Sequence, residues 1–186
     1  EPYVKGVIER FKDDKRVLMW DLYNEPGNTS PSSYGKFEPK NKDELSLNLL
    51  KLAMQWARQV NPSQPITVGV WKSEWHPDKV DALNRYQLEN SDIVTFHDYS
   101  ALARTKERVE SLKPWGRPLI CTEYMARTAG STFAEALPYF KQQNIGAISW
   151  GLVAGKTQAN YPWESWERAF TAEPEIWFHE VFRKDG

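Results

Sequence analysis

The sequence holds one cysteine and three histidines among 186 residues, and this scarcity excludes several kinds of site. A single Cys121 excludes an internal disulfide and any zinc site built from several cysteines. Cys121 lies in an apolar run, so we interpret it as a buried packing residue. No apolar run approaches the roughly 20 residues of a membrane span. The 24 Lys and Arg nearly balance the 25 Asp and Glu. We therefore expect neither nucleic acid nor a membrane as a partner.

Aromatic residues are the compositional excess, with 9 Trp and 8 Tyr in the chain. Several of them fall in expected loops rather than in apolar runs. Clefts that bind sugars need flat apolar faces beside hydrogen-bonding groups, and Trp and Tyr supply both. The 40% hydrophobic content is enough for one globular core.

The apolar spacing predicts helices and strands in alternation. We expect helices over 3–11, 43–60, 77–86, 102–112, 132–143 and 173–182, and strands over 17–22, 66–70, 93–96, 118–122 and 147–150. Asp43 is the expected N-cap of the second helix, and Asn61 and Pro62 end it. That helix carries one apolar face, made of Leu45, Leu49, Leu52, Trp56 and Val60.

Strands that alternate with helices predict a parallel sheet in an α/β fold. A doubly wound sheet would suit five strands, but no Gly-rich phosphate turn follows any of them. The polar candidates instead follow several different strands, as in a TIM barrel, which has eight. We therefore expect residues 1–186 to form a single partial (β/α)8 barrel domain, its C-terminal five-eighths, from helix 3 through helix 8.

Two acids follow two of the expected strands. Asn24, Glu25 and Pro26 come after the first strand, and Glu123 directly follows the run 118–122. Parallel barrel strands end at the same face, so these carboxyl groups are expected to oppose each other. Two carboxyl groups about 5 to 5.5 Å apart can cleave a glycosidic bond through a covalent intermediate. One of the two must then be protonated and the other ionised.

Four segments resemble motifs of retaining glycoside hydrolases of clan A, most closely the cellulase-like family 5. They occur in the family's order and are Trp20-Asp-Leu-Tyr-Asn-Glu-Pro26, Phe96-His-Asp-Tyr99, Thr122-Glu-Tyr124 and Ser149-Trp-Gly151. The resemblance implies that Glu25 is the acid/base and Glu123 the nucleophile. It also implies that the substrate-binding residues are Asn24 at the sugar 2-hydroxyl, His97, Tyr99 and, as an aromatic platform, Trp150.

The same resemblance implies a carbohydrate substrate, no cofactor, no bound metal and a secreted or periplasmic location. The family's strand-2 Arg and strand-3 His motifs have no counterpart in this sequence. We therefore expect this chain alone to be inactive. We also expect it to pair with a missing N-terminal barrel segment, or with itself, through exposed strand edges.

The roles of several aromatic and histidine residues have two interpretations. His97 is either a site residue or a satisfied strand-end histidine, and Trp150 either a platform or a cap on the core. Four loop tryptophans either line sugar subsites or pack against the protein: Trp71, Trp75, Trp163 and Trp166. His76 and His179 are expected at the surface.

Three functions remain open at this point. The first is a retaining O-glycoside hydrolase that acts on a β-linked polysaccharide or oligosaccharide. The second is a metal-dependent hydrolase with Glu25, His97 and Glu123 as ligands. Its weakness is the small number of histidines. The third is a non-catalytic carbohydrate-binding or structural barrel fragment.

Overall fold

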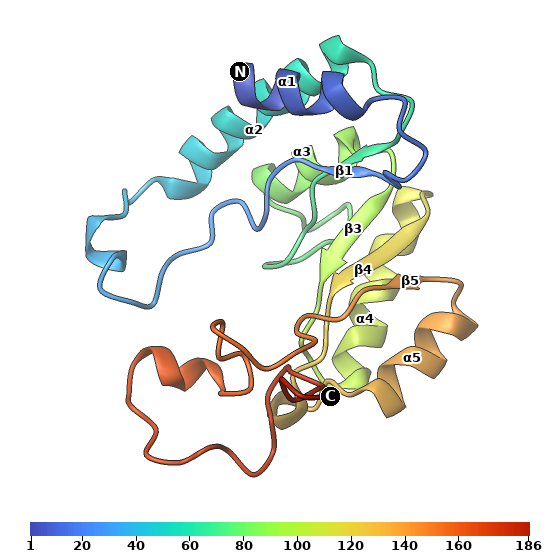
Figure 1. Cartoon of the computed structure of the whole chain (residues 1–186). Coiled ribbons are helices and arrows are strands. Elements are labelled where there is room, and N and C mark those ends of the chain that lie inside the picture. Colours follow the sequence, from blue (N-terminus) through green and yellow to red (C-terminus); the bar gives the residue numbers. More distant parts are fainter. The chain divides into compact units, whose positions relative to one another are not determined.

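The computed structural model describes residues 1–186 and has the expected α/β fold. Five short strands alternate with five α-helices along the chain (Figure 1). The helices are α1 (Pro2–Phe11), α2 (Lys42–Val60), α3 (Ala82–Asn90), α4 (Leu102–Leu112) and α5 (Phe133–Gln142). The strands are β1 (Trp20–Asp21), β2 (Ile66–Thr67), β3 (Val94–His97), β4 (Leu119–Glu123) and β5 (Gly146–Ala147). No helix is both long and apolar enough to span a membrane.

The chain divides into two compact units. The first comprises Glu1–Thr29, Glu38–Thr95 and Ser111–Pro118, and the second Ser30–Phe37, Phe96–Glu110 and Leu119–Gly186. Strand β3 begins in the first unit and ends in the second. Whether the chain is a single barrel domain stays a prediction.

The first unit is built around the pair β1 and β2. These strands are parallel, with Trp20 opposite Ile66 and Asp21 opposite Thr67. Helices α1 and α2 lie side by side over the apolar core (Figure 1). The buried side chains of that core are Ile8, Leu50, Met54, Ala57, Ile66, Val68 and Leu83.

Helix α2 differs from its sequence-based description in two respects. Its N-cap is Asn41 rather than Asp43, which lies in the first turn and pairs with Lys72 at 2.6 Å. The structure buries the face of Leu50 and Met54, next to the face expected to be apolar. Three leucines of that expected face remain nearly half exposed: Leu45, Leu49 and Leu52.

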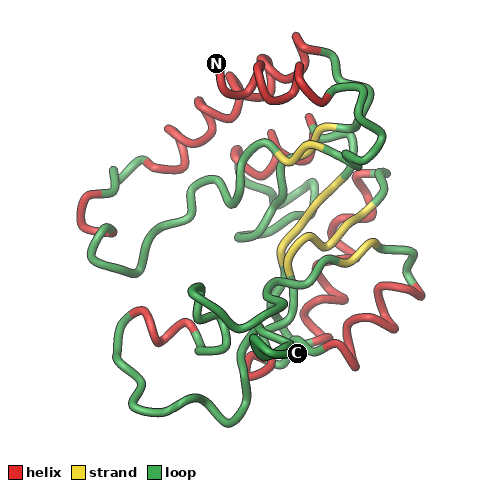
Figure 2. Tube along the Cα trace, viewed as in Figure 1, coloured by secondary structure: helices red, strands yellow, loops and turns green.

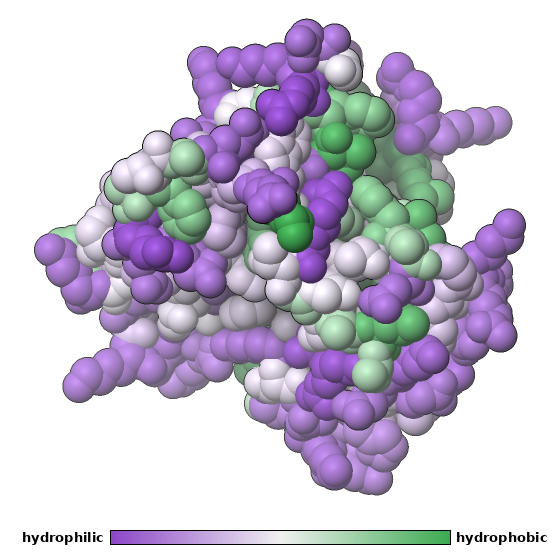
Figure 3. All heavy atoms as spheres, turned by 90° about the horizontal axis from the view of Figure 1, so that it is seen from below, coloured by the Kyte–Doolittle hydropathy of each residue, from purple (hydrophilic) through white to green (hydrophobic).

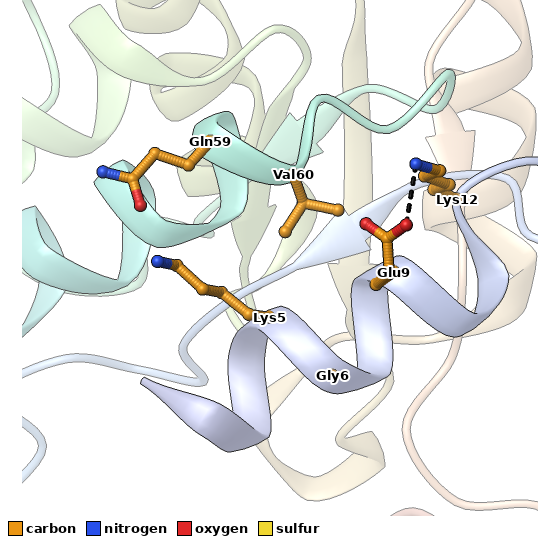
Figure 4. A pocket seen from close by; sticks show the side chains of 6 residues that line it. All are labelled: Lys5, Gly6, Glu9, Lys12, Gln59 and Val60. Atoms are coloured by element: carbon orange, nitrogen blue, oxygen red, sulfur yellow. Dashed lines mark ion pairs between the residues drawn. The ribbon is translucent and has the colours of Figure 1, made fainter.

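The end of α2 forms as its sequence indicates. Asn61 adopts the left-handed conformation with φ 55°, and its backbone N–H donates to Ala57 and Arg58 carbonyl oxygens. This arrangement satisfies carbonyl groups that a helix end leaves unpaired. Between α1 and the end of α2 lies a cavity of about 500 Å³, whose lining includes Lys5, Glu9 and Gln59 (Figure 4). None of the predicted site residues lines it.

The second unit contains β4, β5 and the end of β3. These strands form a three-stranded sheet with the order β3-β4-β5. Strands β4 and β5 are parallel, with Cys121 opposite Ala147. Their hydrogen bonding continues beyond β5, because the Ile148 N–H donates to Cys121 and the Trp150 N–H to Tyr124. The predicted strand over 147–150 is therefore extended backbone next to β4, although the regular strand is shorter.

The predicted helix over 173–182 is wrong. After β5 the chain is mostly loop, interrupted by the short helix η4 (Trp163–Trp166) (Figure 2). The backbone in this region pairs with distant segments rather than with its own next turn. Phe178 accepts from the Arg127 N–H, and Val181 donates to Leu152. These long-range bonds replace the local bonds that a helix needs.

Candidate active site

Glu123 is the last residue of β4, and its carboxylate meets two side chains from the end of β3. Its Oε2 accepts a hydrogen bond of 2.7 Å from the Tyr99 hydroxyl and lies 3.3 Å from His97 Nδ1. His97 and Tyr99 are two residues apart, so an extended backbone directs both to one side. The backbone N–H of Asp98 donates to the Glu123 carbonyl at 2.9 Å, which aligns the two strand ends. The structure therefore brings three predicted site residues together.

Asp98, between His97 and Tyr99, is anchored on the opposite side of the strand. Its carboxylate is fully buried and accepts from Arg108 Nη1 of α4 and from the Ser100 N–H, both at 3.1 Å. A buried charge needs such partners, because removal from water without them is costly. The ion pair ties the end of β3 to α4 and so holds the two residues that contact Glu123.

Cys121 lies two residues before Glu123 and is buried, as predicted. Its Sγ donates to the Glu123 carbonyl oxygen at 3.3 Å. Burial raises the pKa of the thiol well above its ordinary value, and the nearby Asp98 charge adds to this effect. A thiol with a raised pKa is a poor nucleophile. Cys121 is therefore a packing residue.

Trp150 follows β5 at the same end of the sheet as Glu123. Its backbone N–H donates to the Tyr124 carbonyl at 3.0 Å, one residue beyond Glu123. The side chain is 45% exposed, so it does not cap the core. An exposed indole beside a strand end is free to contact a ligand.

Asn24 and Glu25 belong to the first unit, where they follow β1. Asn24 is exposed and Glu25 half-buried. The Glu25 Oε2 accepts a hydrogen bond from Asn28 Nδ2. Glu25 has φ 45°, a left-handed conformation that costs a non-glycine residue about 1–2 kcal/mol. Strained backbone of this kind concentrates at functional sites.

The turn after Glu25 is fixed by several contacts within the first unit. Trp71 Nε1 donates to the Pro26 carbonyl at 3.2 Å, and Lys72 Nζ donates to the Gly27 carbonyl at 3.1 Å. Gly27 has φ 75°, and a Cβ there would overlap the Asp43 carboxylate. Only glycine fits this turn. Trp71 thus holds the loop that carries Glu25, whereas Trp75 is a packing residue because it is 1% exposed.

His179 was expected at the surface, and this prediction is wrong. The side chain is 2% exposed, and its Nδ1 lies 2.6 Å from the Met125 carbonyl oxygen. A carbonyl only accepts, so Nδ1 carries the proton in this contact. The imidazole packs 5.2 Å from the Tyr99 ring, between ring centroids. His76, also expected at the surface, has a side chain that is 42% exposed.

Two residues that the sequence did not assign to the site, Phe178 and His179, pack with Tyr99 and Trp163 in one group, which we call the aromatic cluster. Sequence reasoning placed 173–182 in a helix, so it separated Phe178 and His179 from the site. The only signal in the sequence is the run Trp177-Phe-His179 in a Trp-rich loop. This run lies close to the segment that follows β5, since a Cβ at Gly151 would lie 2.8 Å from the His179 Cβ.

Burial lowers the pKa of His179 below its ordinary value of 6.5. The hydrogen bond to Met125 opposes this effect and the Arg127 charge adds to it. The unfolded chain then binds a proton more readily than the folded protein. The stabilisation from neutral His179 is complete above the unfolded pKa and is lost as pH falls through the lower folded pKa.

We therefore expect the free energy of unfolding to fall less on acidification in His179→Gln than in the unchanged protein. Urea unfolding at about pH 7.5 and about pH 5 measures this, because the unchanged protein should lose more free energy of unfolding than the variant. His76→Gln is the matched control, since the His76 side chain is 42% exposed whereas that of His179 is buried. An equal loss in the unchanged protein and in His179→Gln would contradict the assignment.

Comparison with known proteins places the chain among glycoside hydrolases. The model of the cellulase family, glycosyl hydrolase family 5, matches residues 2–163. Comparison with curated protein sequences finds no match.

Similar solved structures share the fold at low sequence identity. A glycosylated endo-β-1,4-xylanase of family 10 from Gloeophyllum trabeum has a TM-score of 0.57 at 17% identity, over 99% of this chain and 61% of that one. The endo-β-1,4-mannanase from Thermotoga petrophila has 0.56 at 14%, over 97% and 45%. A family 2 member from Bacteroides cellulosilyticus DSM 14838 has 0.53 at 17%, over 84% and 18%. The chain thus spans only part of each structure, as expected for part of a TIM barrel.

Proposed function

The chain belongs to the cellulase family, glycosyl hydrolase family 5, and from this premise we propose that it is the C-terminal part of a retaining O-glycoside hydrolase. Its substrate is a β-linked polysaccharide or oligosaccharide, cleaved by double displacement between two Glu residues. The observation that carries the proposal is the Glu123 carboxylate at the end of β4, held by the Tyr99 hydroxyl and next to His97.

Glu123 is the proposed nucleophile. One carboxylate oxygen, Oε2, is engaged by Tyr99 and His97, which fixes the rotamer of the side chain. A carboxylate with a fixed direction can attack the anomeric carbon and form a covalent glycosyl-enzyme. Asp98 and Arg108 support this geometry from behind, through the buried ion pair.

Glu25 is the proposed acid/base, and Asn24 the partner of the sugar 2-hydroxyl. In the first half of the reaction Glu25 donates a proton to the leaving oxygen, and in the second half it takes one from the attacking water. The reaction needs the two carboxyl groups about 5 to 5.5 Å apart. The left-handed backbone at Glu25 and the fixed turn behind it support a residue held for such a task.

Trp150 is the proposed sugar platform. Its exposed indole follows β5 and offers an apolar face at the strand end that also carries Glu123. Stacking on an aromatic face, together with hydrogen bonds from His97 and Tyr99, would orient the sugar for attack.

Exposed apolar side chains support the proposed partner, a further barrel segment before the first unit or a second copy of the chain. Figure 3 shows apolar patches among hydrophilic residues on one face of the molecule. Leu18, which precedes β1, is 70% exposed, and Leu152, which follows β5, is 61% exposed. Exposed apolar side chains of this kind favour association with another chain.

Turnover of an aryl β-glycoside tests this function and its dependence on the partner segment. We expect hydrolysis by the chain joined to a preceding barrel segment and none by residues 1–186 alone. Hydrolysis by both would contradict the need for the segment. Hydrolysis by neither would favour the non-catalytic carbohydrate-binding or structural alternative.

A further inference from the structure

Trp163 stands at the start of η4 with one part of its indole packed and another part exposed. Its ring meets Tyr99 edge to face, with centroids 5.3 Å apart at 88°, and Phe178 at 4.8 Å and 80°. His179 lies 5.8 Å away. The residue is nevertheless 40% exposed. The other members of the aromatic cluster thus fix the direction of a partly exposed indole.

The segment behind this indole is anchored to the end of β4 and the turn that follows. Arg127 Nη1 donates to the carbonyl oxygens of Trp177 and Glu180, both at 2.9 Å. The backbone N–H of Phe178 donates to Asn160, and that of His179 to Ala159. Together with the His179 contact to Met125, these bonds hold the loop in place without a regular helix.

Tyr99 links Trp163 to the reacting group. The Tyr99 hydroxyl donates to the Glu123 carboxylate while its ring contacts Trp163. The indole of Trp163 is therefore one side chain away from the group that would hold the anomeric carbon of a bound sugar. Gly151 packs on His179, so the platform residue Trp150 adjoins the same cluster.

We propose that Trp163 is a stacking residue for a neighbouring sugar unit of a β-linked chain, positioned by Phe178 and His179. The inference rests on the proposed function and deepens it, because it adds a subsite for chains longer than one sugar. Trp163 is the last residue of the match to the family, and Phe178 and His179, which position it, follow that match in the chain.

Binding to oligosaccharides tests the proposal without relying on turnover. The chain joined to its preceding barrel segment and carrying Glu123→Gln is titrated with cellohexaose, xylohexaose and mannohexaose. Calorimetry measures the Kd of each hexasaccharide. For a hexasaccharide that binds, Trp163→Ala should raise Kd about 5- to 10-fold, and Trp163→Phe should recover part of the loss. Trp166→Ala is the matched control, because Trp166 lies in the same short helix and is 60% exposed.

The outcomes separate the inference from the function on which it rests. If a hexasaccharide binds and Trp163→Ala behaves like Trp166→Ala, the stacking role is overturned and the proposed function stands. If Trp163→Ala and Trp163→Phe weaken binding equally, a stacking ring is not what the site needs, and the proposal also fails. If the parent protein binds and cleaves none of the β-linked substrates, the proposed function fails and takes the inference with it.

Discussion

Replacing Glu123 with glutamine should lower kcat by several orders of magnitude and leave substrate binding nearly unchanged. The amide has the shape of the carboxylate and can still accept the hydrogen bond from the Tyr99 hydroxyl. It cannot attack the anomeric carbon as a carboxylate does, so the covalent route is closed. Steady-state kinetics of the full-length protein on a β-linked oligosaccharide would measure the loss.

Glu135→Gln is the control for this experiment, because Glu135 is an exposed residue in the first turn of α5 and should tolerate the change. Added azide should not rescue Glu123→Gln with retained configuration, because retention requires the missing intermediate. Near-normal turnover by Glu123→Gln would contradict the nucleophile assignment and the pairing of the 122–124 segment with the family's motif.

Replacing Glu25 with alanine should slow the first chemical step, and the factor should depend on the leaving group of the substrate. A natural sugar leaving group needs a proton as it departs, so its cleavage should fall by several orders of magnitude. An aryl leaving group of low pKa needs little protonation and should be released at a far less reduced rate. Pre-steady-state measurement of aryl release, compared with oligosaccharide cleavage, gives the two losses.

Asn28→Ala controls for damage to the loop, since Asn28 donates to the Glu25 carboxylate and its loss leaves the carboxyl group in place. This variant should affect aryl and natural substrates to a similar, small extent. Equal large losses for both substrates in Glu25→Ala would point to a structural role, or to a metal-ligand role, for Glu25.

The cluster of Glu123, His97 and Tyr99 was predictable because its signals are local. An apolar run that ends in an acid marks a strand end, and His97 and Tyr99 face one side because they are two residues apart. Helices α1, α2, α4 and α5 form within a residue of their expected bounds, because apolar spacing and the breaking residues define them. Helix α3 lies later than expected, at Ala82–Asn90, where the Asp81 side chain caps it by accepting from the Asn84 N–H.

The aromatic cluster was not predictable, because long-range contacts form it. The spacing within 173–182 suits a helix, yet the backbone there pairs with Arg127 and Leu152. These bonds place His179 in the interior, where it contacts the Met125 carbonyl oxygen and the Tyr99 ring. The buried face of α2 was missed for a related reason, since two apolar stripes adjoin on that helix and only packing selects one.

Azide tests most directly whether Glu25 acts on a covalent intermediate carried by Glu123. In Glu25→Ala of the full-length protein, azide can enter the space left by the carboxyl group and attack without a general base. We expect a β-glycosyl azide from an aryl β-glycoside, identified by NMR, with faster turnover as azide increases. If no glycosyl azide forms and aryl and natural substrates lose activity together, Glu25 is not the acid/base and the retaining mechanism is contradicted.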